Sequence, residues 1–137
     1  MRWAIIPNVT IAVVEDNKLI RELVVNVFMY CVNRNVLSFE NGVEAWNYLA
    51  SHGRADIVVA DVDMPKMNGF ELLSKIKKKY PRKICIIMSG DPSNEKSAKD
   101  LGADSFLAKP FNLKDLFNIV QTYVAGDSQK PSRMTAI

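Results

Sequence analysis

Carboxylates, a hydroxyl group and an ammonium group each follow an apolar stretch of this sequence. They belong to Glu15 and Asp16, to Asp61, to Ser89 and to Lys109. Carboxylates that lie close together repel one another, and a divalent cation that prefers oxygen ligands, such as Mg²⁺, relieves that repulsion. A carboxylate can also be a nucleophile toward phosphorus, while a metal ion and a lysine neutralise charge on the transferring phosphoryl group. If the fold brings these residues together, they could carry phosphoryl transfer to Asp61.

The apolar stretches indicate how these residues could meet. Ile57 to Ala60 and Ile84 to Met88 are continuous apolar runs, which are typical of parallel strands buried on both faces of a sheet. Further strands are predicted at residues 10–14, 35–39 and 104–108. The carboxyl ends of parallel strands lie along one edge of a sheet, and ligands bind at that edge in open α/β sheets. We therefore expect the polar residues to share this edge.

Helical periodicity fills the intervals between the strands. Helices are predicted after Asn17, over residues 43–50, 70–80 and 93–101, and after Asn112. The alternation predicts an α/β fold with a single doubly wound, five-stranded parallel sheet and five helices. Leu19 and Leu23 should face the core in the first helix, and Leu113 in the last. Only Ala98 and Leu101 anchor the fourth helix, which fits a mobile element.

Length and composition fit one soluble globular domain, with 137 residues, 48% hydrophobic and 24% charged. The formal charge of +3 gives no reason to expect direct nucleic-acid binding. No apolar run could span a bilayer, so we expect no membrane contact and a cytoplasmic location. Cys31 and Cys85 are predicted to be buried free thiols, and His52 a surface residue. The basic residues from Lys75 to Lys83 should form a solvated helix end.

Taken together, the motifs resemble the receiver domain of two-component response regulators, which has a flavodoxin-like fold. The resemblance covers about residues 9 to 125, with an extension at residues 1–8 and a tail at 126–137 that is predicted to be disordered. It rests on Glu15-Asp16, Asp61 with Met64-Pro65 and Gly69, Ser89-Gly90, Gly102-Ala103-Asp104, and Lys109-Pro110-Phe111. Each motif is weak by itself, but the ordered set is highly specific.

The resemblance implies a role for each position in a reaction that depends on Mg²⁺ or Mn²⁺. Asp61 would accept a phosphoryl group from a phosphohistidine on a sensor histidine kinase or a phosphotransfer protein. Asp16 and Asp61 would bind the metal with the backbone carbonyl of Asp63, and Glu15 would act through water. Lys109 would pair with the phosphoryl group. Such a domain catalyses its own phosphorylation and dephosphorylation but is not a turnover enzyme in the usual sense.

The resemblance also implies a switch. Ser89 would close onto the phosphoryl group, and Phe106 would turn inward as Ser89 moves. The face formed by the fourth helix, fifth strand and fifth helix would then change, and would bind a downstream protein or form a homodimer on phosphorylation. Phe106 replaces the more familiar tyrosine, so no hydroxyl group takes part there. Asp63 and Asp91 each follow a catalytic position by two residues, and we expect them to tune the rates of phosphorylation and phosphoryl loss.

Two alternative interpretations remain open. Asp61-Val62-Asp63 resembles the Asp-x-Asp pair of haloacid dehalogenase-type phosphatases, in which the first Asp is the nucleophile and the second a general acid. That family places the pair on its first strand, whereas here the pair falls on the third. The chain could instead be a pseudo-receiver, an interaction module with the fold but no phosphorylation. Such a module is expected to lack one or more key residues, and all of them are present here.

Overall fold

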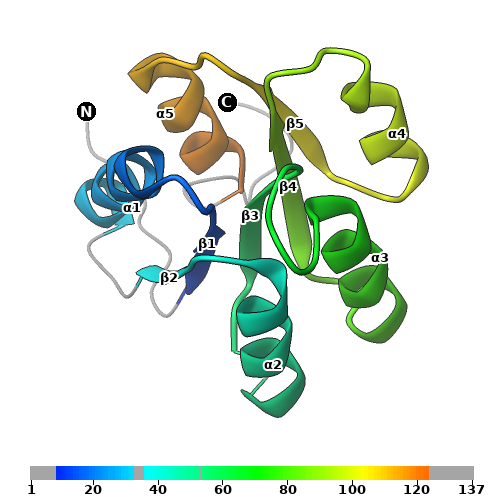
Figure 1. Cartoon of the computed structure of the whole chain (residues 1–137). Coiled ribbons are helices and arrows are strands. Elements are labelled where there is room, and N and C mark those ends of the chain that lie inside the picture. Colours follow the sequence, from blue (N-terminus) through cyan, green and yellow to red (C-terminus); the bar gives the residue numbers. More distant parts are fainter. Residues whose placement is uncertain (1–8, 33–35, 53, 124–137) are drawn as a thin grey trace.

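A parallel sheet forms the centre of the molecule (Figure 1). The computed structural model describes residues 9–32, 36–52 and 54–123. The strands are β1 (Ile11–Val14), β2 (Val36–Phe39), β3 (Ile57–Asp61), β4 (Ile84–Ser89) and β5 (Ser105–Ala108). They lie in the order β2-β1-β3-β4-β5, and every neighbouring pair is parallel. β3 is therefore the central strand, and Asp61 lies at the middle of the carboxyl edge.

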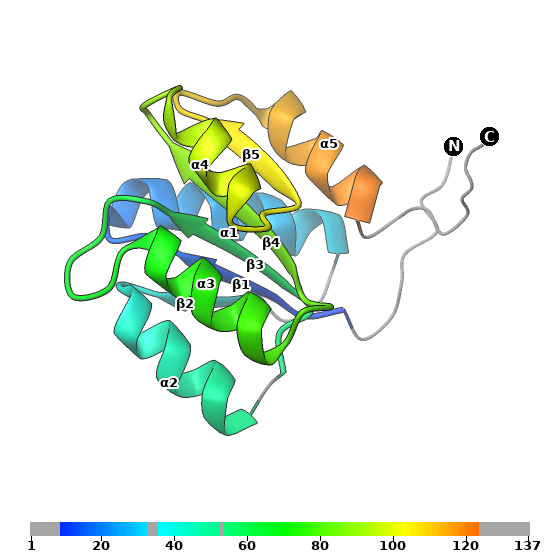
Figure 2. The same cartoon turned by 90° about the vertical axis from the view of Figure 1, so that its right-hand side faces the viewer.

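Helices cover both faces of the sheet, as Figures 1 and 2 show. They are α1 (Lys18–Val32), α2 (Gly42–His52), α3 (Gly69–Lys79), α4 (Asn94–Asp100) and α5 (Leu113–Tyr123). α1 and α5 pack on one face, and α2, α3 and α4 pack on the other. The predicted doubly wound α/β fold is thereby confirmed.

Side chains along each strand alternate between two halves of the core. In β3, Val58 and Ala60 belong to the half that faces α2, α3 and α4. Ile57 and Val59 belong to the other half, with Phe28 of α1. All five residues of β3 are buried. Because helices cover both faces, the central strand needs apolar side chains on both sides, which explains its continuous apolar run.

A capping box fixes the start of α3. The Asn68 side chain accepts a hydrogen bond from the Glu71 backbone N–H at 2.9 Å, and the Glu71 carboxylate accepts one from the Asn68 N–H at 3.2 Å. α3 ends at Lys79, shortly before Pro81, as predicted. The cap also determines where the loop after Asp61 ends, so it helps to set the path of the backbone beside that carboxylate.

Four leucines that were predicted to face or anchor the core are exposed instead. The exposed fractions are 78% for Leu19, 45% for Leu23, 40% for Leu101 and 51% for Leu113. In α1 the core covers a narrower face, centred on buried residues such as Phe28, than the apolar stripe of the sequence suggests. Leu101 and Leu113 lie at helix ends, beyond the turns that pack on the sheet.

The structure tests the predictions for Cys85 and for the basic end of α3, but not those for Cys31, His52 and the two ends of the chain. Cys85 is a buried free thiol as predicted, and burial raises its pKa to about 12. The side chains of Cys31 and His52, the extension at residues 1–8 and the tail at 126–137 lie outside the described residues. The basic helix end is not simply solvated, because Lys77 Nζ forms an ion pair with Asp104 Oδ2 at 2.9 Å. No helix within the described ranges is long and apolar enough to cross a membrane.

Candidate functional site

The predicted site residues meet at the carboxyl edge of the sheet. Asp61 is the last residue of β3, and Glu15 follows β1 directly. Ser89 is the last residue of β4, and Lys109 follows β5. The Lys109 backbone N–H donates a hydrogen bond to the Ser89 carbonyl oxygen at 2.8 Å, which ties these two strand ends together. The topology therefore brings together residues from four separate parts of the chain.

Lys109 forms ion pairs with two buried carboxylates. Its Nζ lies 2.7 Å from Asp61 Oδ1 and 2.9 Å from Glu15 Oε1. Asp61 is 4% exposed and Glu15 only 1%. A buried carboxylate without a partner would be costly, so the ammonium group is what makes this arrangement tolerable. The pairing of Lys109 with Glu15 was not predicted from the sequence, since it depends on two strand ends that are distant along the chain.

Burial and the neighbouring charges shift the pKa values of Asp61, Glu15 and Lys109 in opposite directions. Burial raises the pKa of Asp61 and of Glu15, although hydrogen bonding to Lys109 offsets part of that rise. Burial lowers the pKa of Lys109, but the hydrogen bonds and charges of Asp61 and Glu15 outweigh burial and raise it. Lys109 therefore remains a cation near neutral pH. Ionisation of the two carboxylates therefore costs free energy, and an additional nearby cation would reduce that cost.

Backbone N–H groups hold the remaining carboxylate oxygens. Asp61 Oδ2 accepts a hydrogen bond from the Asp63 N–H at 3.0 Å. Glu15 Oε2 accepts one from the Asn17 N–H at 3.1 Å. Arg21 Nη1 donates to the Glu15 carbonyl oxygen at 2.8 Å, which links the first turn of α1 to the end of β1. The hydrogen bonds from the Asp63 and Asn17 N–H groups orient the two carboxylates.

Gly69 allows the chain to pass close to the phosphoacceptor position predicted from the sequence. Its N–H donates a hydrogen bond to the Val62 carbonyl oxygen at 3.0 Å, so the loop after β3 folds back on itself. A Cβ atom at position 69 would lie 2.3 Å from the Asp61 carbonyl oxygen, which no side chain could tolerate. Within this loop Lys66 has a φ of 72°, in the left-handed region. The glycine of the motif therefore has a steric role.

Three carboxylates form a set of oxygen donors at this edge. One oxygen each from Glu15, Asp16 and Asp61 lies within 4.8 Å of the others. Asp16 is exposed, unlike the other two, so the set opens to solvent on its side. Hard oxygen ligands, with room for water, are what Mg²⁺ or Mn²⁺ prefers. The donor set therefore fits the metal that the sequence suggested.

Ser89 is buried and is held on the side of α4. It is 1% exposed, and its Oγ accepts hydrogen bonds from the Asp91 N–H at 3.0 Å and from Asn94 Nδ2 at 2.9 Å. Among the described residues, its hydroxyl group has no hydrogen bond to Asp61 or Lys109. Asn94 was not predicted from the sequence to belong to the site, because an asparagine near the start of a helix usually indicates a cap.

The remaining predicted site residues surround this centre. Phe106 is partly buried and packs on the half of the core that contains Ala98 of α4. The side chain of Asp63 is exposed. Asp91 is also exposed, and its Oδ1 accepts hydrogen bonds from the N–H and the hydroxyl group of Ser93. The bonds from Ser93 lower the pKa of Asp91. Asp63 and Asp91 therefore add negative charge at the rim of the site.

Comparison with known proteins identifies the family. Residues 11–121 match the family model described as the response regulator receiver domain. This chain belongs to that family. Receiver domains are phosphorylation-dependent signalling switches of two-component systems. They typically bind Mg²⁺ at an acidic pocket, and they interact with histidine kinases or phosphotransfer donors and with downstream effectors.

Individual relatives differ in how much of their length this chain covers. The DNA-binding transcriptional regulator NtrC of Rhizobium meliloti (strain 1021) is 34% identical over 127 residues, which are 91% of this chain but 26% of NtrC. A chemotaxis protein CheY homolog of Campylobacter jejuni subsp. jejuni is 32% identical over 103 residues, 72% of this chain and 79% of that protein. This receiver domain therefore spans about a quarter of the NtrC regulator.

The folds agree as well. The structure of the chemotaxis response regulator CheY4 of Vibrio cholerae superposes with a TM-score of 0.74 at 29% identity, over 82% of this chain and 96% of CheY4. These similarities favour neither the haloacid dehalogenase-type phosphatase nor the pseudo-receiver module.

Proposed function

We propose that Asp61 is the residue that accepts the phosphoryl group in this receiver domain, whose extent we place at residues 9–125. The observation that carries the proposal is the pairing of a buried carboxylate at the end of the central strand with Lys109, at 2.7 Å. Asp61 is the carboxylate of the site that is closest to Lys109 Nζ, and Asp63 N–H holds its second oxygen. The donor we propose is a phosphohistidine on a sensor histidine kinase or phosphotransfer protein.

The transfer would break one bond to phosphorus and form another. An Asp61 carboxylate oxygen attacks phosphorus, the P–N bond of the phosphohistidine breaks, and the imidazole leaves with that electron pair and takes up a proton. The raised pKa of Lys109 keeps its ammonium group charged, so it can neutralise a phosphoryl oxygen throughout. Later attack by water on the same phosphorus would release phosphate and regenerate the Asp61 carboxylate.

The residues that would hold Mg²⁺ or Mn²⁺ are Asp16 and Asp61, with the backbone carbonyl of Asp63, and with Glu15 acting through water. The closeness of the three carboxylates supports this assignment. When bound, the ion would offset the charge of the carboxylates and of the phosphoryl oxygens. Glu15 itself is paired with Lys109 at 2.9 Å, so we assign it an indirect role.

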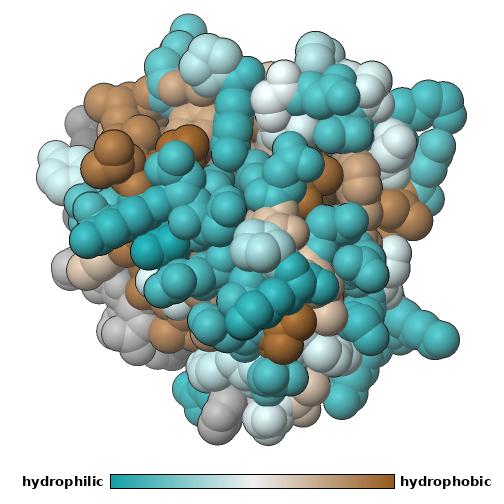
Figure 3. Space-filling model, in the orientation of Figure 1, coloured by the Kyte–Doolittle hydropathy of each residue, from teal (hydrophilic) through white to brown (hydrophobic). Residues whose placement is uncertain are grey.

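Exposed leucines beside the site suggest where the donor protein binds. Leu19 and Leu23 of α1 are 78% and 45% exposed, and Leu113 at the start of α5 is 51% exposed. Figure 3 shows hydrophobic side chains gathered over α1 and α5, at the upper left of that view. Since α1 begins just after Asp16, an apolar face here would place a donor histidine beside the carboxylates. We therefore propose this face for the kinase or phosphotransfer protein.

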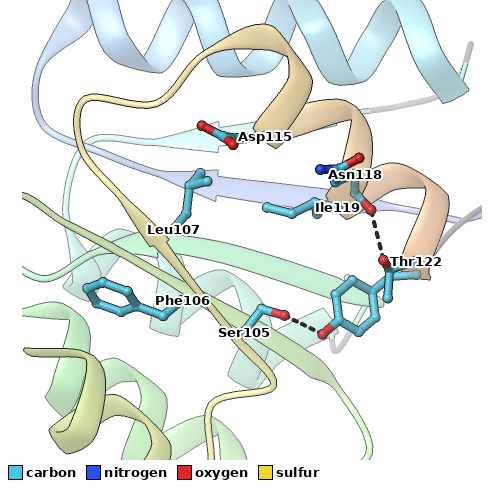
Figure 4. Close-up of a pocket in the computed structure, with 8 residues that line it drawn as sticks. Ser105, Phe106, Leu107, Asp115, Asn118, Ile119 and Thr122 are labelled. Carbon is cyan, nitrogen blue, oxygen red and sulfur yellow. Dashed lines mark hydrogen bonds between the residues drawn. The ribbon is translucent and has the colours of Figure 1, made fainter. Parts of the chain in front are cut away.

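For the downstream partner, or for a second copy of the chain in a homodimer, we propose the face formed by α4, β5 and α5. A hollow of about 240 Å³ lies between β5 and α5. Figure 4 shows Phe106 and Leu107 leaving β5 on opposite sides. Ser105 is hydrogen-bonded to Tyr123, and both residues line this hollow. A phosphoryl group that draws Ser89 toward the site would leave room for Phe106, and so would bias the packing of this face.

Intact-mass measurement after incubation with Mg²⁺ and a small-molecule phosphodonor tests the proposal. The wild-type protein and Asp63→Asn should each gain one phosphoryl group, and Asp61→Asn should gain none while remaining folded. Asp63→Asn is the matched control, since it removes an acid two residues away. NMR spectra of the phosphorylated protein should also change at Lys96, Lys99, Phe106, Lys114 and Asn118. Undiminished phosphorylation of Asp61→Asn would exclude Asp61 as the acceptor.

A further inference from the structure

The hydroxyl group of Ser89 is already committed to other partners. A serine hydroxyl has one proton to donate and two lone pairs that accept. Its lone pairs accept from the Asp91 N–H at 3.0 Å and from Asn94 Nδ2 at 2.9 Å. Its proton points to the Asp91 carbonyl oxygen at 3.4 Å, which is a long hydrogen bond. To donate to a phosphoryl oxygen at Asp61, Ser89 must turn, and turning disrupts the bond from Asn94.

Asn94 also connects the site to a weakly anchored helix. α4 has seven residues, and Ala98 is the one that is buried. Its ion pairs, Lys96 with Asp100 and Lys99 with Glu95, are internal to the helix and exposed, so they do not attach it to the sheet. Within the described part of the chain, the bond from Asn94 to Ser89 is the side-chain hydrogen bond that joins α4 to a strand.

We propose that Asn94 is a positioning residue, which holds the Ser89 hydroxyl group toward α4 and thereby competes with the phosphoryl group for Ser89. When Ser89 donates to the phosphoryl group, the first turn of α4 loses its hydrogen bond to β4. Phosphorylation of Asp61 would therefore loosen the attachment of α4 to the sheet. The second half of this inference, the competition between Asn94 and the phosphoryl group for Ser89, rests on the proposed function. The first half, the coupling of Asn94 to α4 through Ser89, does not depend on phosphorylation.

A double-mutant cycle on the unphosphorylated protein tests the first half. Asn94→Ala and Ser89→Ala should each speed amide hydrogen exchange in α4 by about threefold to tenfold, the factor that one net hydrogen bond contributes. The double variant should exchange no faster than Ser89→Ala alone, because Ser89→Ala already removes the bond from Asn94. Ser97→Ala, an exposed change in the same helix, should not speed exchange. Independent effects that multiply in the double variant would overturn the coupling.

The rate of phosphorylation by a small-molecule donor tests the second half. Asn94→Ala should raise this rate by about threefold, because Ser89 no longer has to give up the bond from Asn94. In a Ser89→Ala background the same change should have no effect, which a merely structural role of Asn94 would not predict. Equal effects in both backgrounds would overturn the competition. If the wild-type protein gains no phosphoryl group, the proposed function is refuted. The hydrogen-exchange measurements on the unphosphorylated protein would still show whether Asn94 is coupled to α4 through Ser89.

Discussion

Lys109 Nζ lies 2.7 Å from Asp61 Oδ1, so an ammonium group from the end of β5 neutralises the buried carboxylate at the end of β3. The same nitrogen lies 2.9 Å from Glu15 Oε1 at the end of β1. One lysine thus links three strands at the carboxyl edge of the sheet. This geometry places a cation beside the proposed phosphoacceptor.

Removing the Lys109 charge should weaken the fold as well as the chemistry. Lys109→Ala leaves two buried carboxylates without their cation, so we expect a loss of about 3 kcal/mol in the free energy of unfolding at pH 7. Urea denaturation would measure it. Lys96→Ala, which removes an exposed ion pair with Asp100, should cost about 0.5 kcal/mol or less. Equal losses for the two variants would show that the buried ion pairs of Lys109 contribute no more to the free energy of unfolding than an exposed ion pair does.

Stability should depend on pH in a direction set by Asp61. Because burial raises its pKa above the ordinary 3.8, the native state holds this proton more tightly than the unfolded state does. Its contribution to stability is therefore most favourable below pH 3.8 and falls as pH rises through that value toward the native pKa. Without Mg²⁺, Asp61→Asn should accordingly unfold at a higher temperature than the wild-type protein at pH 7. An advantage that persists undiminished below pH 3.8 would contradict this assignment.

Mg²⁺ should stabilise the protein by relieving repulsion among the carboxylates. At about 100 times its dissociation constant, a single bound ion should add about 2.7 kcal/mol to the free energy of unfolding. Thermal melts with and without chelator would measure the shift. Asp16→Asn should lose most of it, whereas Asp63→Asn should keep it, because only the backbone carbonyl of Asp63 is proposed as a ligand. A shift that survives in Asp16→Asn would remove Asp16 from the ligand set.

Asp63 and Asp91 should slow phosphorylation by anionic donors. Both carboxylates are exposed at the rim of the site, where they repel an incoming anion. The double variant Asp63→Asn with Asp91→Asn should therefore be phosphorylated faster by a small anionic donor at low salt, by a factor of about three. Asparagine at position 91 can still accept hydrogen bonds from Ser93, so the loop should keep its conformation. The gain should shrink as salt rises, and a gain insensitive to salt would argue against repulsion.

Apolar runs and helical periodicity in the sequence were sufficient to predict the parallel sheet. They also predicted that the polar residues after its strands lie together at the carboxyl edge. The run from Ile57 to Ala60 identified the central strand, and the residue types after each strand identified the chemistry. The pairing of Lys109 with Glu15 was missed, because it depends on where two side chains point after the strands are in place. Asn94 was missed for a similar reason, since its partner Ser89 lies on a strand and not in its own helix. Leu19 was misplaced because an apolar stripe in the sequence cannot distinguish a side chain that packs in the core from one that stays exposed.

The position of the phosphoryl group on the wild-type protein tests the central claim most directly. The protein would be phosphorylated in the presence of Mg²⁺, the acyl phosphate reduced with borohydride to mark its site, and the digested peptides sequenced by mass spectrometry. We expect the mark at Asp61 and at no other residue. A mark at Asp63, Asp16 or Glu15, with Asp61 unmodified, would contradict the proposal that the carboxylate paired with Lys109 is the phosphoacceptor.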